Sequence, residues 1–333
     1  LLGSPNIASK IWVYGQYDHE VGIRTVTKPG YDASVLRLDN GKFLSIKIDG
    51  NPKQCYINPR EGAIGCFEEA CRNVVCTGAK PIGMLDHLQF GNPTDPEIFW
   101  TFLESLKGLT DFAKDFEIPC VGGKVSLYNE TSDGPIKPTP VIGVIGLIDK
   151  KPLKIQKINS GDSLIMIGDT KDELGGSEYA EYIHKFIGGK CPTVNFSESK
   201  KNMTSVLDII ENELIKSAHD CSKGGLTIAI SELCMMNQIG CNVSLEKIPG
   251  EKLDSDKILF SESHSRYLVT FENRNLEKLE EILKKHNVSY SLIGEFTGDS
   301  ILFSSDSKSI IDLSVDKAQK TWFNSLKEMV LHA

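Results

Sequence analysis

The sequence predicts a two-domain protein of mixed α and β structure, and three observations support this fold class. Of the 333 residues, 40% are apolar and 25% are charged, which is an ordinary profile for a globular protein. Short apolar runs, typical of strands, alternate with longer amphipathic segments that are typical of helices. A polar stretch, Asp149-Lys150-Lys151-Pro152, interrupts this alternation near the middle of the chain. We therefore expect one domain at 1–150 and a second at 151–333.

Composition disfavours several classes of partner. The 37 basic and 45 acidic residues give a net charge of −8 without a basic stripe, which disfavours a nucleic acid. The longest apolar run near the middle, residues 141–148, is too short to span a membrane, and no signal peptide is evident. The chain begins at Leu1 rather than Met, so we expect a fragment, a processed product or a trimmed chain.

The nine cysteines are scattered along the chain and form no Cys-x-x-Cys pair, so a zinc site is not expected. We interpret them as buried thiols of a protein in a reducing cytosol. Cys221 lies near His219, which would suit a thiol nucleophile. Nothing nearby marks an orienting third group or an oxyanion site, so this reading is disfavoured.

Apolar periodicity and turn or cap residues place the elements of the N-terminal half. An Asp-Asn-Gly turn predicts a hairpin, and Thr94-Asp95-Pro96-Glu97 has the form of a capping box with proline in the first turn. The last strand is continuously apolar, which predicts burial on both faces. In order, we expect strands at 34–38 and 43–48, a helix at 61–78, a strand at 81–89, a helix at 94–116 with Phe99, Phe102, Leu106, Leu109 and Ala113 inward, and a strand at 138–148.

The same criteria place the elements of the C-terminal half. Gly175-Gly176 opens one helix and could bind an anion there, although plain capping is favoured. Gly224-Gly225 opens another helix beside His219-Asp220. In order, we expect a strand at 163–168, the helix opened by 175–178, helices at 199–216 and up to about 236, a strand at 267–271, a helix at 275–286, two strands within 288–304 and a closing helix that carries Trp322 and Phe323.

The stretch at 119–130 is the strongest candidate for a ligand site. It reads as a strand, a tight turn at Gly122-Gly123 and a second strand. Adjacent glycines let the backbone approach a ligand, and backbone N–H groups in such a turn can form an anion-binding nest. Polar side chains follow within seven residues, a mixture that suits a phosphorylated ligand with a metal ion: Lys124, Ser126, Asn129 and Glu130. The alternative is a hairpin turn whose polar residues face water.

Two further places offer titratable groups. Asp49 ends a predicted strand next to Gly50, where a carboxylate could bind a metal or simply mark a turn. Asp18 and His19 could form an acid/base pair, although an exposed loop histidine is favoured.

Seven runs together resemble the C-terminal half of the phosphoribosylformylglycinamidine synthase family, in the aminoimidazole ribonucleotide synthetase-like superfamily. The runs occur in order along essentially all of residues 1–333. They are Ser4-Pro5-Asn6-Ile7-Ala8-Ser9-Lys10, Gln16-Tyr17-Asp18-His19, Phe90-Gly91-Asn92-Pro93, Pro96-Glu97-Ile98-Phe99-Trp100, Val125-Ser126-Leu127-Tyr128-Asn129-Glu130, Ser217-Ala218-His219-Asp220 and Ser261-Glu262-Ser263. Another ATP-dependent member of the superfamily, resembling thiamine monophosphate kinase or a selenide-activating enzyme, is a less favoured alternative.

The resemblance implies a β-rich, barrel-forming N-terminal domain followed by an α/β C-terminal domain. It also implies a cytoplasmic ligase of purine biosynthesis that binds ATP and Mg²⁺. The family converts formylglycinamide ribonucleotide, ATP and glutamine-derived ammonia to formylglycinamidine ribonucleotide, ADP and phosphate. The implied partners are an N-terminal synthetase half, the glutaminase subunit PurQ and the small subunit PurS.

Carried over by position, the resemblance assigns Asp86 and Gly123 to ATP and Ser126 to the substrate. Lys124 stands where the family has a magnesium-binding asparagine, and a charged lysine has no lone pair for a metal. Weaker candidates, at positions where the other half of the repeat has ligand-binding carboxylates, are Asp49, Asn51 and Asp220.

The family's catalytic histidines lie in the N-terminal half, so the resemblance identifies no catalytic residue in this chain. We therefore expect an active site that forms only with that other half. An alternative is a non-catalytic half that completes the barrel and holds a structural nucleotide. An unpaired barrel edge would be apolar, so a homodimer that mimics the tandem pair is also expected.

Overall fold

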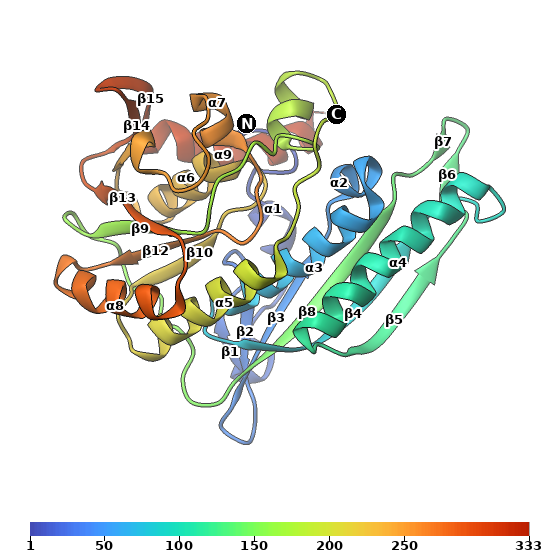
Figure 1. Ribbon diagram of the computed structural model, residues 1–333, viewed down its shortest axis with the longest axis horizontal. Helices are drawn as coiled ribbons and strands as arrows, with labels where there is room; N and C mark the ends of the chain where they lie inside the picture. Colours follow the sequence, from blue (N-terminus) through green and yellow to red (C-terminus); the bar gives the residue numbers. More distant parts are fainter. Residues whose placement is uncertain (333) are drawn as a thin grey trace.

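The computed structural model describes residues 1–332, and each half of the chain contains one large β-sheet (Figure 1). The N-terminal sheet has the strand order β1-β2-β3-β8-β4-β5, and its neighbours are antiparallel except for β4 and β5. A small ribbon of β6 (Glu130–Thr131) and β7 (Gly134–Pro135) follows it. The six strands are β1 (Thr25–Thr27), β2 (Ser34–Arg37), β3 (Phe43–Asp49), β4 (Lys80–Gln89), β5 (Cys120–Ser126) and β8 (Thr139–Ile148).

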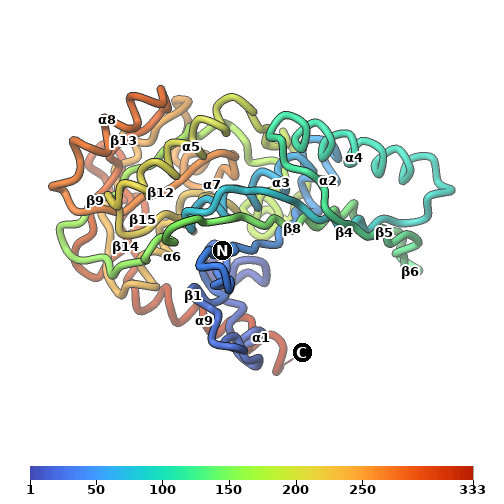
Figure 2. Tube along the Cα trace, turned by 90° about the horizontal axis from the view of Figure 1, so that it is seen from below, coloured from blue at the N-terminus to red at the C-terminus, as the bar shows by residue number. Residues whose placement is uncertain are grey.

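One face of this sheet is covered by α3 (Pro59–Val75), which packs against β3 and β8. The helix α4 (Pro96–Phe116) lies outside α3, and the short α2 (Pro52–Ile57) leads into it. Figure 2 shows these helices on one side of the sheet. Nearly every residue of α3 is buried, as is typical of a helix that lies between two layers.

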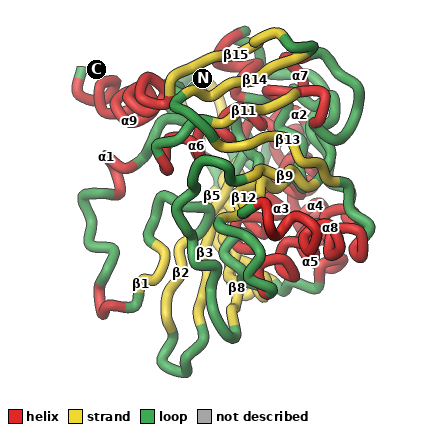
Figure 3. The backbone as a smooth tube through the Cα atoms, turned by 90° about the vertical axis from the view of Figure 1, so that its left-hand side faces the viewer, coloured by secondary structure: helices red, strands yellow, loops and turns green. Residues whose placement is uncertain are grey.

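The C-terminal sheet has seven strands in the order β10-β12-β9-β13-β11-β14-β15, a succession that Figure 3 shows in yellow. Its strands are β9 (Ser163–Ile167), β10 (Ser217–Asp220), β11 (Cys241–Ser244), β12 (Tyr267–Phe271), β13 (Tyr290–Phe296), β14 (Ser300–Ser305) and β15 (Lys308–Ser314). The helices are α5 (Phe196–Glu211), α6 (Gly225–Asn237), α7 (Ser255–Phe260), α8 (Leu276–His286) and α9 (Val315–Leu331).

A shared hydrophobic core joins the two sheets. Alternate residues of β9 point to opposite faces, with Ile165 and Ile167 in the core that also contains α3, and Leu164 and Met166 in a second core with α6. The N-terminal segment crosses to the C-terminal half, where α1 (Ile11–Tyr14) contacts α9 (Figure 2). Within residues 1–332, no helix is long and apolar enough to cross a membrane.

Most of the predicted elements are confirmed. The hairpin of β2 and β3 is present, β12 has the predicted bounds, and α3, α5, α6 and α8 lie within a few residues of the predicted helices. Eight of the nine cysteines are buried free thiols, as expected, and Cys120 is exposed.

Two predictions about α4 are wrong. The helix is capped by Asp95, whose Oδ1 accepts from the backbone N–H groups of Glu97 (2.8 Å) and Ile98 (3.4 Å). Thr94 instead donates its hydroxyl to Asn92, so no capping box forms. Phe99 is 45% exposed rather than inward, because only one stripe of α4 meets α3.

The expectation that the strand at 138–148 is buried on both faces is also wrong. Buried and half-buried residues alternate along β8. The helix α3 covers one face of the strand only, and the other face is open. Gly143 lies on this second face, whereas Gly146 lies on the covered face against Val74 of α3. The sequence therefore looks continuously apolar although only one side of the strand is buried.

Candidate functional site

The two residues predicted to contact ATP lie side by side on neighbouring strands. Asp86 on β4 is opposite Gly123 on β5 in their parallel pairing. A Cβ atom at residue 123 would overlap the Asp86 carboxylate, so only glycine permits this approach. The predicted tight turn is wrong, because residues 120–126 form one continuous edge strand in which neither Gly122 nor Gly123 has a positive φ.

Strand alternation separates the other predicted residues from this pair. Lys124 and Ser126 pair with His87 and Gln89 of β4, so they point to the opposite face of the sheet from Asp86. Lys124 and Ser126 therefore share one face and Asp86 and Gly123 share the other. A ligand that contacts all four would have to reach around the edge formed by β5.

The loop after β5 is held by its own polar side chains. Asn129 donates its amide to the carbonyl groups of Phe90 (3.0 Å) and Ser126 (2.8 Å), and its Oδ1 lies 3.3 Å from the Ser126 hydroxyl. This amide therefore fixes the turn beyond the strand. Glu130 is exposed on the small ribbon and joins no ligand-like cluster among residues 1–332.

On β4 and β5, Asp86 is the carboxylate that could contact a magnesium ion bound together with a nucleotide. Burial raises the pKa of its carboxyl, although the Cys120 thiol, 3.8 Å from Oδ2, and the Lys124 backbone N–H favour the charged form. Lys124 does not fit as a metal ligand, because its ammonium has no lone pair. A single carboxylate is compatible with Mg²⁺ that is held mainly by phosphate oxygens and water.

The weaker candidates lie elsewhere, around the polar side chains of α3. Asp49, at the end of β3, and Glu69 of α3 both face Lys223, which lies in the loop before α6. Burial, followed by the charge of Asp49, raises the pKa of Glu69 to about 8. This carboxylate pair therefore carries about one negative charge at neutral pH, which matches the single charge of Lys223.

Asp220 and Asn51 also have partners within the chain. Asp220 Oδ2 accepts from Arg72 (3.1 Å) and from Asn73 (3.2 Å), both on α3. Asn51 caps α2, where its Oδ1 accepts from the Gln54 backbone N–H at 3.2 Å. The structure thus gives each of these predicted ligand residues an intramolecular contact.

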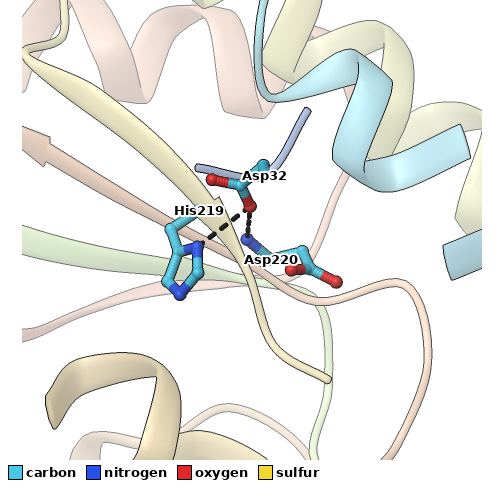
Figure 4. A group of neighbouring side chains, drawn as sticks. All are labelled: Asp32, His219 and Asp220. Carbon is cyan, nitrogen blue, oxygen red and sulfur yellow. Dashed lines mark hydrogen bonds and ion pairs between the residues drawn. The ribbon is translucent and has the colours of Figure 1, made fainter. Parts of the chain in front are cut away.

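A third group, shown in Figure 4, combines Asp32, His219 and Asp220. The His219 ring is held by Asp32 (2.9 Å) on Nδ1 and by Glu232 (3.1 Å) on Nε2. Burial opposes the charge on the ring, but the two carboxylates outweigh it and hold the pKa of His219 well above 6.5. A protonated imidazole has no free lone pair, and these residues form an ion-pair cluster in this structure. A cavity of about 540 Å³ opens beside it.

The two glycine pairs that were predicted to open helices have different surroundings. Gly224 caps α6, and its N–H donates to the Glu262 carboxylate at 2.8 Å. The same oxygen accepts from the Glu178 N–H at 2.8 Å, so the chain fills this site with its own anion. The helix after Gly175-Gly176 is a single turn at Tyr179–Ile183, whose N-cap residue Glu178 makes no side-chain cap within residues 1–332. The Ser177 hydroxyl accepts from the Ala180 backbone N–H at 3.1 Å, a contact of the favoured capping kind.

The two other nucleophile or acid/base candidates are not supported. His19 Nε2 contacts the Tyr14 carbonyl oxygen at 2.7 Å, and Asp18 accepts from the Glu20 backbone N–H. These contacts leave Asp18 and His19 unpaired with each other. Cys221 is fully buried, and burial raises the pKa of its thiol, which disfavours the thiolate.

Sequence reasoning missed the polar residues of α3 and the loop residue Asp32. Glu68, Glu69, Arg72 and Asn73 occur within six positions of a helix that was predicted from its apolar stripe alone. Their spacing places them on one side of the helix, and all four are buried. The sequence did contain a signal for this cluster, because four polar residues occur together in a helix that is flanked by strongly apolar strands.

An open, mainly antiparallel sheet, joined through one buried helix to an α/β layer, places the chain in a class of two-layered folds of mixed α and β structure. The AIR synthase related N-terminal domain matches residues 30–148, and the AIR synthase related C-terminal domain matches residues 159–305. Together these two regions account for most of the chain. The chain therefore belongs to the AIR synthase related family.

Within this family the chain is similar to PurL subunits. It is 42% identical over 340 residues to phosphoribosylformylglycinamidine synthase subunit PurL of Methanocaldococcus jannaschii, covering 99% of this chain and 46% of the relative. The solved structure of Thermotoga maritima PurL complexed with FGAR superposes with a TM-score of 0.76 at 20% identity, over 89% of this chain and 49% of that chain. The structure of the same protein complexed with ATP superposes with a TM-score of 0.73 at 19% identity, over 92% of this chain and 49% of that chain. The chain spans about half the length of these relatives.

Proposed function

We propose that this chain forms the C-terminal half of a PurL-type synthetase, which converts formylglycinamide ribonucleotide and ammonia to formylglycinamidine ribonucleotide at the expense of ATP. The observation that carries this proposal is the 42% identity to the Methanocaldococcus jannaschii PurL subunit, which extends over 99% of this chain but less than half of the relative. A match at this level over both domains supports a shared reaction as well as a shared fold.

The contacts proposed for this half lie on β4 and β5. Asp86 and Gly123 would contact ATP and its magnesium ion, and Ser126 would contact the substrate. Three features support these roles: Asp86 and Gly123 are neighbours on adjacent strands, a Cβ at residue 123 would displace the Asp86 carboxylate from its present position, and β5 lies at an open edge of the sheet. The complexes of Thermotoga maritima PurL with ATP and with FGAR agree with this choice of ligands.

The open face of the N-terminal sheet supports a partner that completes a barrel. Ile48 and Leu85 lie on either side of Gly143 in one row of this face, and they are 66% and 42% exposed. Exposed apolar side chains in a row favour burial against another protein surface. The proposed partner is the N-terminal synthetase half, and without it two copies of this chain would form a homodimer through the same face.

Two further subunits and a location complete the proposal. A glutaminase, PurQ, would supply ammonia, and the small subunit PurS would join the complex. The similarity of this chain to the PurLQS structure from Thermotoga maritima supports such an assembly. The cytoplasm is the proposed location, which agrees with eight buried free thiols.

The test is ADP formation from ATP, Mg²⁺, ammonia and formylglycinamide ribonucleotide. It is measured with this chain alone, with the N-terminal half alone and with both. Activity only in the mixture supports a shared site. Turnover by this chain alone would contradict it, and His19 and His219 would then be the first residues to replace. Inactivity of a mixture that has been shown to associate would contradict the reaction itself.

Lys124 favours a second candidate, a half that holds a nucleotide without turnover. The exposed ammonium could neutralise a phosphate but cannot hold the magnesium ion that the family pattern places there. Lys124→Asn separates the two cases. Magnesium-dependent nucleotide affinity gained by this variant favours a degenerate site, whereas lost affinity favours a site adapted to lysine.

A further inference from the structure

We propose that the ammonium group of Lys223 takes the place of a metal ion between the carboxylates of Asp49 and Glu69. The resemblance assigns ligand-binding roles to this region, and the structure disagrees with that assignment. The inference goes beyond the proposed reaction and does not depend on which substrate the chain serves.

The geometry is that of a cation shared by two carboxylates. Lys223 Nζ lies 3.2 Å from Asp49 Oδ1 and 3.5 Å from Glu69 Oε1. The Asp49 and Glu69 side chains are each 8% exposed, and Lys223 is 25% exposed. The three residues come from a strand end, a helix and a loop of the other half of the chain, so their convergence is a product of the tertiary fold.

One carboxylate oxygen of this group has no partner within the described part of the chain even with the ammonium in place. Asp49 Oδ2 is buried and has no hydrogen-bond partner among the described residues. A buried carboxylate oxygen without a partner is costly, because it has lost its water without replacement. The ammonium therefore satisfies part of the ligand set that the two carboxylates offer.

The surrounding charges disfavour a metal ion in the native chain. Asp220, a further carboxylate in this network, accepts from Arg72 and Asn73. Lys47 donates to Asn73 Oδ1 at 2.9 Å and adds a second positive charge nearby. Glu262 is held by the Gly224 N–H. A metal ion would have to displace Lys223 while the positive charges of Arg72 and Lys47 remain nearby.

Removal of the ammonium should turn the pair into a cation site. Without Lys223 the buried Asp49 carboxylate has no counter-ion, which is strongly unfavourable. A hard divalent cation such as Mg²⁺, Mn²⁺ or Ca²⁺ could bind the oxygen atoms of both side chains, and the Glu69 carboxyl would give up its proton when the cation binds. Lys223→Ala removes the charge and also opens the space that the side chain occupied. The variant should therefore bind a divalent cation that the native chain does not bind at this position.

The experiment titrates Mn²⁺ into the full chain and measures free Mn²⁺ by electron paramagnetic resonance. Lys223→Ala is expected to gain one site, at least ~10-fold tighter than any site of the native chain, because the buried Asp49 carboxylate gains a counter-ion. The matched control is the double variant Lys223→Ala/Glu69→Gln, which should lose the gained site. Equal Mn²⁺ binding by the native chain and Lys223→Ala overturns the proposal, as does native binding that Asp49→Asn abolishes.

Thermal unfolding provides a second measurement in case Lys223→Ala does not fold in chelator. The variant is then refolded with Mn²⁺ or with Na⁺ at equal ionic strength. Recovery with Mn²⁺ alone supports the proposal, and failure to recover with Mn²⁺ overturns it. A purely structural lysine would give a loss of stability that Mn²⁺ does not restore.

Discussion

Asp49 and Asp86 lie in one row across the N-terminal sheet, because both pair in register with Ile142 of β8. They are two strands apart, or roughly 10 Å, and they point to the same face. Their surroundings differ. Asp49 is buried against Lys223 and Glu69, whereas Asp86 is half-buried near the open edge beside Gly123. The row thus presents one carboxylate already neutralised by the chain and one available to a ligand.

Gly123→Ala should weaken ATP binding, because the new Cβ would overlap the Asp86 carboxylate and displace it. Hydrogen bonds to charged groups contribute about 1.5–3 kcal/mol, so the loss of the Asp86 contact should lower ATP affinity by roughly ten-fold or more. The measurement is calorimetric ATP binding to the complex with the N-terminal half. The neighbouring Gly122→Ala is the control, since its Cβ would meet only Leu85 Cδ2 at an ordinary 3.5 Å. Equal losses in both variants would argue against a role for the Asp86–Gly123 contact.

The two sheets show which parts of the fold could be predicted from the sequence. Strands with apolar runs and clear ends, such as β12, were placed correctly, because burial on both faces demands such residues. The edge strand β15 was missed, because most of its residues are exposed and it lacks the continuous apolar run of a buried strand. The turn predicted at Gly122-Gly123 was wrong because a glycine can serve either a positive φ or the close approach of another group to the backbone. Only the position of the neighbouring strand decides between the two.

The candidate site was predictable in part for a similar reason. The family resemblance located Asp86, Gly123 and Ser126, but spacing along the chain could not show that the strand turns Ser126 away from the other two. The α3 cluster was missed because its partners are distant in sequence. Arg72 meets Asp220 across 148 positions, a contact that only tertiary packing creates.

Arg72→Met should be among the most destabilising substitutions in the chain. Arg72 is 1% exposed and contacts Glu68, Asp220 and the Cys221 carbonyl oxygen. Removal of one partner from a buried ion pair costs about 3–5 kcal/mol, because the remaining charges stay buried. Urea unfolding measures this change. Arg60→Met is the control, since the Arg60–Asp111 pair is exposed and should contribute less than about 1 kcal/mol. Similar losses in the two variants would contradict the proposed importance of burial.

His219 should make stability depend on pH. Burial lowers the pKa of His219, but Asp32 and Glu232 raise it more, so that it lies well above 6.5. Burial raises the pKa of Asp32, but the charge and hydrogen bond of His219 lower it more, so that this pKa is lowered overall. The histidine contribution is therefore complete below about pH 6.5 and is lost as pH rises through the raised pKa. The contribution of Asp32 to stability is present above the usual pKa of an aspartate, and it is lost as the pH falls through the lowered pKa that Asp32 has in the folded chain.

The corresponding variant is His219→Asn, compared with the native chain by urea unfolding from pH 6 to pH 9. At pH 6 the variant should be less stable by about 2 kcal/mol, since hydrogen bonds to charged groups contribute about 1.5–3 kcal/mol. The difference should shrink as pH rises. Asp32→Asn, which removes one of the two carboxylates, should reduce the same pH dependence. A difference that stays constant with pH would mean that His219 acts through packing alone.

Leu85→Arg should prevent association through the open face of the N-terminal sheet while leaving the chain folded. Leu85 lies beside Gly143 and across from Ile48 on a face that α3 does not cover, so an arginine there can reach water in the isolated chain. In a complex the same side chain would be buried without a partner, which costs several kcal/mol. Sedimentation velocity with and without the N-terminal half measures the effect. Ile310→Arg, at an equally exposed position on the edge strand β15, is the control and should leave association unchanged. If the native chain is a monomer at high concentration, the homodimer is excluded, and the mixture with the N-terminal half then decides whether this face binds a partner.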